Sequence, residues 1–142
     1  MATEKSAFTK HIAEAIYSEV TEDIRVSVVS EPIIVNSDPL RNVFAFSYTV
    51  TIENLGRETS QLLERHWIIK SNGTQIAEVV GPGVVGEQPV LEPGSSFQYA
   101  SGAVIQDPIG SMEGAYTFRA ESGRFFNVLI PRFELLFPIV LH

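Results

Sequence analysis

A chain of 142 residues is long enough to bury one sizeable hydrophobic core but too short for two ordinary domains. Its 17 acidic and 10 basic residues give a formal net charge of −7, which disfavours nucleic acid and anionic lipid surfaces as partners. The sequence has no cysteine, which excludes disulfides, thiolate metal sites and a cysteine nucleophile. These limits predict a single globular domain.

The first 22 residues do not resemble an export signal, because they lack both a basic start and a long apolar run. A cytoplasmic location is therefore expected. Apolar residues recur every four positions between Ala7 and Val20, which predicts a short helix, or else an arm, in residues 1 to 22. We assign residues 23 to 142 to one domain. The apolar positions of the predicted helix are Phe8, Ile12, Ile16 and Val20.

From Ile24 onward the apolar pattern changes to a period of two, which is typical of half-buried β-strands. The clearest example runs from Phe44 to Ile52, where every second residue is aromatic or β-branched and predicts a face buried in the core. A further strand is expected over Gln61 to Ser71. The dipeptide Asn72-Gly73 then favours a tight hairpin, because both central residues of a type I′ turn need a positive φ.

Short strands separated by turn residues continue to the end of the chain. The strand after the hairpin, Thr74 to Val80, must pair back on the strand before it, and the last paired strand, Phe125 to Ile130, should end at Pro131. The apolar run from Leu135 to Leu141 is shorter than the roughly 20 residues that cross a membrane, and is expected to be a closing strand or a docking tail. The pattern predicts an all-β fold, an antiparallel β-sandwich of fibronectin III or immunoglobulin-like type with about seven or eight strands.

Three glycines with the spacing G-x-G-x-x-G, Gly81, Gly83 and Gly86, form a candidate anion-binding or partner-binding loop together with Gln88. A dinucleotide fingerprint of this kind needs a helix that opens at the last glycine. The residues that follow favour no helix, and Pro82 lacks the N–H group that an anion would need. The alternative is structural: the glycines let a loop cross between strands or pack closely beneath a neighbour.

The residues Arg65, His66 and Trp67 form a candidate partner-binding strand, with Trp67 expected either in the core or as an exposed aromatic anchor. Glu64 and His66 would share one face of this strand. Two side chains are fewer than the three or four protein ligands of a zinc site, so neither a metal site nor a cofactor is predicted. No serine lies in a G-x-S-x-G elbow, so no catalytic residue is predicted.

Six segments share their pattern with one known family: Gln61 to Ile69, Gly81 to Pro89, Leu91 to Gly94, Tyr99 to Gly102, Gly110 to Tyr116 and Ile130 to Phe133. Together they resemble the bacterial ApaG family, also called CorD, over about residues 24 to 142. The resemblance implies a fibronectin III-like sandwich and a link to cobalt and magnesium resistance or efflux. The same domain is appended to some eukaryotic F-box proteins and to a DNA-polymerase-delta-interacting protein, which suggests protein binding. Pro82 departs from the family pattern, where a non-proline residue is usual.

The resemblance implies a non-enzymatic module for protein–protein interaction, whose protein partner the sequence does not identify. Its effect on cobalt and magnesium would be indirect, since a chain that does not insert into a membrane cannot itself conduct ions. The alternative is a module that binds pyrophosphate or a nucleotide through the loop from Gly81 to Gly86. A homodimer is also open, because the edges of β-sandwiches can pair between copies.

Overall fold

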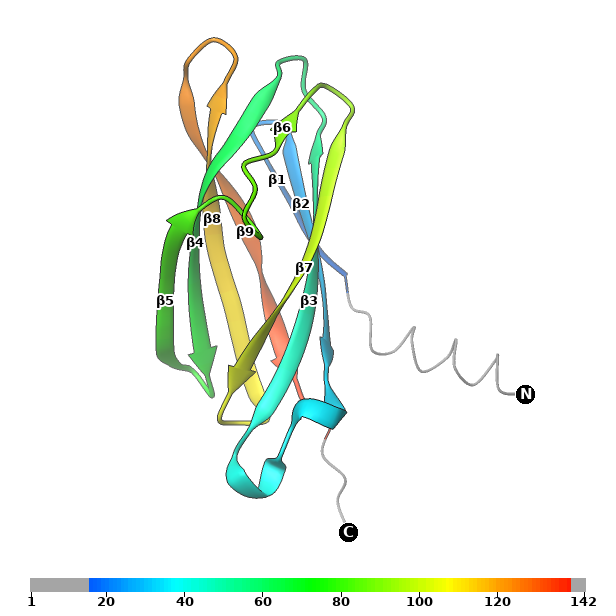
Figure 1. Cartoon of the computed structure of the whole chain (residues 1–142), viewed down its shortest axis with the longest axis vertical. Helices are drawn as coiled ribbons and strands as arrows, with labels where there is room; N and C mark the ends of the chain where they lie inside the picture. The colour runs from blue at the N-terminus through cyan, green and yellow to red at the C-terminus, as the bar shows by residue number, and fades with distance from the viewer. Residues whose placement is uncertain (1–15, 139–142) are drawn as a thin grey trace, which may run out of the picture.

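The computed structural model describes residues 16 to 138, which form two antiparallel β-sheets packed face to face (Figure 1). One sheet has the order β1-β2-β3-β7, with β1 (Ile16–Thr21), β2 (Ile24–Pro32), β3 (Phe44–Asn54) and β7 (Ser96–Ile105). The other has the order β5-β4-β8-β9 with β6 beside β4; its strands are β4 (Ser60–Ser71), β5 (Thr74–Pro82), β6 (Val90–Leu91), β8 (Ile109–Ala120) and β9 (Phe125–Leu136). Two 3-10 turns, η1 (Ile34–Asn36) and η2 (Pro39–Arg41), connect β2 to β3. The predicted antiparallel β-sandwich is confirmed, and its described part has nine strands.

The strongest local patterns of the sequence form the predicted elements. In β3 every second residue from Phe44 to Ile52 is buried. The hairpin between β4 and β5 has a φ of 49° at Asn72 and of 82° at Gly73. It pairs β5 with β4 in antiparallel orientation, as predicted. These elements form as expected because both the burial pattern and the turn geometry are local requirements.

The helix predicted between Ala7 and Val20 is wrong for the residues that the structure describes. Residues 16 to 21 form strand β1, which pairs with β2 and alternates between exposed and half-buried positions. Ile16 and Val20 are both exposed on one side of this strand. A spacing of four places two residues on the same side of a helix and of a strand alike, so it could not distinguish them. The earlier part of the predicted helix lies outside the described residues.

The last strand does not end at Pro131, as the sequence predicted, but continues to Leu136. A register shift places Glu113 of β8 opposite two residues of β9, Pro131 and Arg132. Such a β-bulge tolerates proline, because the bulged position need not donate a hydrogen bond to the neighbouring strand. The segment predicted from Leu135 to Leu141 therefore begins as the end of β9, and its final residues lie outside the described part.

An aromatic cluster in the core joins the two sheets. The ring of Trp67 in β4 lies 5.4 Å from the ring of Tyr48 in β3, measured between centroids. It also lies 6.0 Å from Phe133 and 6.4 Å from Tyr116, both at nearly perpendicular angles. Edge-to-face contacts of this kind stabilise a core beyond the area that they bury.

The sheet edges differ between the two sides of the sandwich. On one side β1 and β9 meet, and the N–H of Leu129 donates a hydrogen bond to the Thr21 hydroxyl at 3.2 Å. The Ser30 hydroxyl of β2 also donates to the carbonyl of Glu134 at 3.0 Å. On the other side β5 and β7 each end their sheet, with no further strand beside them in the described residues. We call this the open side.

Candidate functional site

The candidate loop from Gly81 to Gln88 begins with the last two residues of β5 and continues as a tight turn. Val84 and Glu87 each donate an N–H to the other's carbonyl, at 2.8 and 2.9 Å. Gly83 has a φ of 60°, and a Cβ there would lie 2.1 Å from the carbonyl oxygen of Glu87. Only glycine fits this position without displacing the backbone. Gly86 has a φ of 80° but faces open space. These two glycines serve the geometry of the turn.

Gly81 makes room for the side chain of Arg65. A Cβ at position 81 would lie 3.1 Å from the guanidinium carbon of Arg65. The Nη1 atom of Arg65 donates hydrogen bonds to the carbonyls of Pro82 and Gly83, at 2.9 and 3.0 Å. Arg65 thereby fastens the start of the turn to β4.

A β-bulge in β4 sets the direction of the Arg65 side chain. The register of β4 against β8 shifts between Leu62 and Glu64. As a result Leu62 and Trp67 are both buried, although residues an odd number apart in a regular strand point to opposite faces. Arg65 shares the inner face with Trp67, whereas His66 points outward.

Three buried tyrosines lie near Arg65 between the sheets: Tyr48 of β3, Tyr99 of β7 and Tyr116 of β8. The hydroxyls of Tyr99 and Tyr116 form a hydrogen bond of 2.5 Å from one sheet to the other. Burial raises the pKa of all three hydroxyls, because a phenolate would lose its hydration there. The positive charge of Arg65 opposes this rise but does not cancel it. The three tyrosines therefore ionise only at a higher pH than a free tyrosine, and the hydrogen bond between Tyr99 and Tyr116 connects the two sheets.

The turn leaves few polar groups that could converge on an anion. The N–H of Gly83 donates to the carbonyl of Leu63 at 2.8 Å, and the N–H of Glu87 is bonded within the turn. The side-chain amide of Gln88 also donates to Leu63, at 2.9 Å. Pro82 has no N–H, and Glu87 adds a negative charge. A pyrophosphate site needs several converging N–H groups, and three of the six backbone N–H groups from Gly83 to Gln88 already have partners inside the protein.

The three residues of the candidate partner-binding strand lie in three different environments. Trp67 is only 3% exposed and belongs to the core. Arg65 is bound to the turn after β5. His66 lies on the outer face of the sheet, where its Nε2 is 2.6 Å from Oε2 of Glu78. Because only His66 points to solvent from the outer face, these residues do not form one continuous surface.

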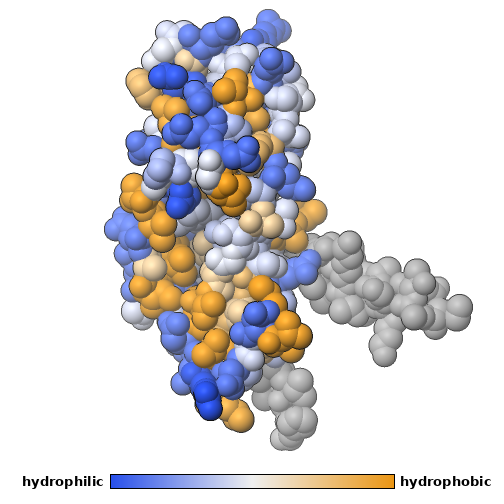
Figure 2. Space-filling model, viewed as in Figure 1, coloured by the Kyte–Doolittle hydropathy of each residue, from blue (hydrophilic) through white to orange (hydrophobic). Residues whose placement is uncertain are grey.

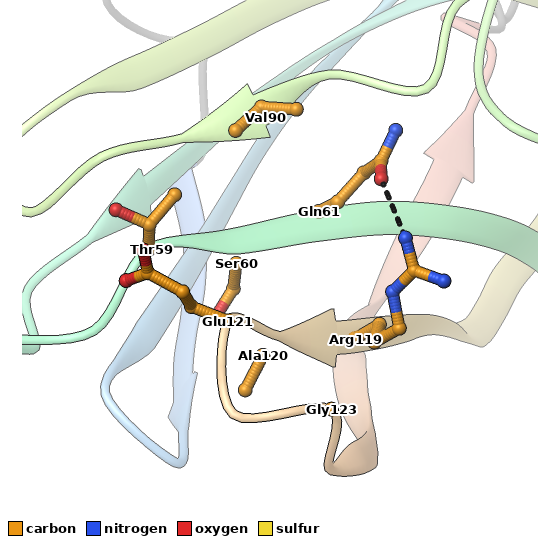
Figure 3. A pocket seen from close by; sticks show the side chains of 8 residues that line it. All are labelled: Thr59, Ser60, Gln61, Val90, Arg119, Ala120, Glu121 and Gly123. Atoms are coloured by element: carbon orange, nitrogen blue, oxygen red, sulfur yellow. Dashed lines mark hydrogen bonds between the residues drawn. The ribbon is translucent and has the colours of Figure 1, made fainter.

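The sequence analysis did not identify a hollow of about 430 Å³ near the start of β4 (Figure 3). The guanidinium of Arg119 lies 3.4 Å from the amide oxygen of Gln61 on one side of it, and Glu121 lies toward the other. Three separate segments contribute its lining, so no local motif could have indicated it. The lining residues are Thr59, Ser60, Gln61, Val90, Arg119, Ala120, Glu121 and Gly123.

One end of the sandwich carries exposed apolar side chains, which the sequence analysis also missed. Leu40 is 97% exposed and Val35 is 92% exposed, both on the 3-10 turns. The turns are ordered: Asp38 and Val43 each donate an N–H to the other's carbonyl, at 2.8 and 3.0 Å. Figure 2 shows hydrophobic residues gathered over the lower half of the view, where this end lies. We define the apolar end as Ile34, Val35 and Leu40 of the two 3-10 turns, which are all exposed.

The signal that could have indicated the apolar end is Leu40, which directly follows the polar residues 36 to 38 and Pro39. Within residues 16 to 138, no three histidine, aspartate or glutamate side chains gather closely enough to hold a metal ion. In the same part of the chain no helix has the length and apolar character needed to cross a membrane.

Comparison with known proteins gives consistent matches along most of the chain. The sequence model of the ApaG domain matches residues 35 to 120. Protein ApaG of Thiobacillus denitrificans is 47% identical over 119 residues, which cover 84% of this chain and 94% of the relative. Protein ApaG of Pectobacterium carotovorum is 50% identical over 106 residues, or 75% and 85% of the two chains. The crystal structure of the putative ApaA protein from Bordetella pertussis matches with a TM-score of 0.80 and 42% identity, covering 83% of this chain and 96% of that one.

Proposed function

The chain belongs to the ApaG domain family, and from this premise we propose that it is a non-enzymatic module that binds another protein. We further propose that it affects cobalt and magnesium resistance or efflux only through that partner. A β-sandwich that offers an ordered apolar surface is suited to such a role. The partner would supply the membrane transport that the module lacks.

The observation that carries this proposal is the exposure of the apolar end. Leu40 and Val35 present nearly their whole side chains to water from turns that the Asp38–Val43 pair holds in place. The two turns are therefore already ordered before a partner binds, which lowers the entropic cost of association. Exposed apolar side chains on an ordered surface are typical of protein-binding sites.

The direct test compares two charge substitutions in a quantitative pull-down from cells that express the protein. The double substitution Val35→Glu and Leu40→Glu should remove the specific partner, because a buried carboxylate would be unpaired in the interface. Leu129→Glu, at an exposed leucine of β9 away from the apolar end, is the matched control and should retain the partner. Retention by the double variant, or equal loss in both variants, would contradict the proposed surface.

The link to cobalt and magnesium needs a separate measurement. A strain without the protein should tolerate less cobalt, and the wild-type chain should restore growth. The Val35→Glu, Leu40→Glu variant should fail to restore it, while circular dichroism shows an intact fold. Full restoration by that variant would separate metal tolerance from the apolar end.

A further inference from the structure

Strand β7 has none of the features that usually protect the edge of a sheet. Residues 94 to 106 contain no charged residue and no proline. The strand pairs with β3 from Ser96 to Ile105 in one uninterrupted register. Natural edge strands are commonly protected by charges, prolines or bulges that prevent pairing with another chain. β7 therefore presents a straight and uncharged backbone edge.

The other edges in the described part of the chain carry such protection. β5 contains the exposed Glu78 and ends at Pro82, and its pairing with β4 shifts register beside Lys70. β9 has a bulge at Pro131, and β1 contains Glu19; these two edge strands also lie against each other. The lack of protection is thus specific to β7.

Hydrogen bonds at the end of β3 identify the backbone groups of β7 that remain unpaired. The N–H of Asn54 donates to the carbonyl of Ser95, whereas the N–H of Leu55 donates to Asp23 on the β2 side, at 3.0 and 2.8 Å. Neighbouring residues in a strand direct their N–H and C=O groups to opposite sides. Even-numbered residues of β3 therefore bond to β7, and the register assigns odd-numbered residues of β7 to these bonds. The groups that point to the edge belong to Ser96, Gln98, Ala100, Gly102 and Val104.

The side chains of β7 suit pairing with a second copy of the same strand. Three larger residues precede Ala100 and three small residues follow it. Antiparallel pairing about a two-fold axis at Ala100 would place each larger residue opposite a small one, and Ala100 opposite itself. Directly opposite side chains lie about 5 Å apart, so size complementarity matters. The facing pairs would be Tyr99 with Ser101, Gln98 with Gly102 and Phe97 with Ala103.

We propose that two copies of this chain associate through β7, antiparallel and symmetric about Ala100. Their sheets β1-β2-β3-β7 then become one continuous sheet across the two-fold axis. This goes beyond the function proposed above, because the occupant is a second copy and the apolar end stays available to a different protein. Each copy has a formal charge of −7, so the copies repel at long range and added salt should strengthen the dimer.

Sedimentation velocity of the full chain over a range of concentrations tests the proposal. The wild type should change from monomer to dimer as its concentration rises. Ala100→Lys and Ala100→Glu each place two like charges opposite one another at the axis, and should weaken association about tenfold or more. An equimolar mixture of the two variants should regain the dimer, because lysine then faces glutamate. A wild type that stays monomeric, or a mixture that does not associate, would overturn the proposal.

The matched control is Gln75→Lys, which places the same charge on the exposed edge strand β5. It should leave the dimer unchanged. Loss of the dimer in Gln75→Lys or in Leu40→Glu, with Ala100→Lys unaffected, would place the contact on β5 or the apolar end and refute pairing through β7. Circular dichroism and thermal unfolding of each variant confirm that the fold is retained, which is expected because Ala100 is exposed. Failure of this test leaves the partner proposal unaffected, since the pull-down addresses a different surface.

Discussion

The turn after β5 and the edge strand β7 both belong to the open side of the sandwich, but they use their backbone polar groups in opposite ways. In the turn the N–H groups of Gly83 and Glu87 have partners inside the protein, and Arg65 binds two of its carbonyls. In β7 the backbone N–H and C=O groups of the even-numbered residues point to the open edge and remain unpaired within the described part of the chain. The turn after β5 carries the recognisable glycine motif, yet these polar groups of its backbone already have partners inside the protein. A glycine motif can reflect the needs of the fold, whereas a strand can offer a binding edge without any motif.

The largest loss of stability is expected from a substitution at Gly83, which would distort the turn after β5. In Gly83→Ala the new Cβ would meet the Glu87 carbonyl at 2.1 Å, in addition to the strain of a φ of 60°. We expect the free energy of unfolding to fall by about 3 kcal/mol. Gly86→Ala is the matched control, because it has a similar φ but open space, and should cost about 1 kcal/mol. Urea denaturation measures both free energies of unfolding. Equal losses would show that the contact between the new Cβ and the Glu87 carbonyl does not add to the cost of the positive φ.

A smaller loss is expected when the turn keeps its glycines but loses Arg65. Arg65→Met removes the hydrogen bonds to the carbonyls of Pro82 and Gly83, and should lower the free energy of unfolding by about 2 kcal/mol. Arg65→Lys should recover only part of this loss, since the lysine ammonium ends one bond short of the Nη1 atom that donates both hydrogen bonds. In both variants the backbone amides of the turn should exchange their hydrogens faster than in the wild type. Full recovery by lysine would mean that the charge alone matters.

The fold followed from the sequence because its signals are local. The alternation in β3 and the Asn72-Gly73 turn each determine an element without reference to the rest of the chain. The errors arose where the signal was ambiguous or depended on a neighbouring strand. The four-residue spacing of Ile16 and Val20 fits a strand as well as a helix. The continuation through Pro131 depends on the bulge opposite β8, which no single strand reveals.

The site was less predictable than the fold, because it depends on which groups remain unpaired after folding. The sequence locates Gly83 in a motif but does not show that its N–H donates to Leu63. Similarly, the bulge in β4 that turns Arg65 toward Gly81 is a property of the pairing with β8. The exposure of Leu40 and the open edge of β7 are also consequences of tertiary structure. Composition alone showed only that β7 lacks charges.

The side chains on the inner face of β7 are shielded from water, in contrast to the backbone groups at its edge, and this should affect the ionisation of Tyr99. Burial raises the pKa of Tyr99 above that of a tyrosine in the unfolded chain, about 10. Above that pH the unfolded chain releases a proton that the folded chain retains, so the contribution of Tyr99 to stability is constant at lower pH and falls as the pH rises. Tyr99→Phe should remove about 1 kcal/mol of this loss over the first pH unit above 10. Urea denaturation of both proteins at pH 9 and 11 measures the difference; identical pH dependence would show that Tyr99 ionises normally in the folded state.

The smallest expected change in stability comes from the edge itself. Ala100→Lys adds an exposed side chain at a residue whose N–H does not bond to β3, so the free energy of unfolding of the monomer should change by less than about 0.5 kcal/mol. Hydrogen exchange of the wild type at concentrations where it is monomeric should then show fast exchange at Gln98, Ala100 and Gly102, and slow exchange at Tyr99 and Ser101. Raising the concentration should slow the first group alone, because only those amides gain partners in the dimer. Equal protection of both groups in the monomer would mean that the edge of β7 is already covered, and would remove the contrast with the turn after β5.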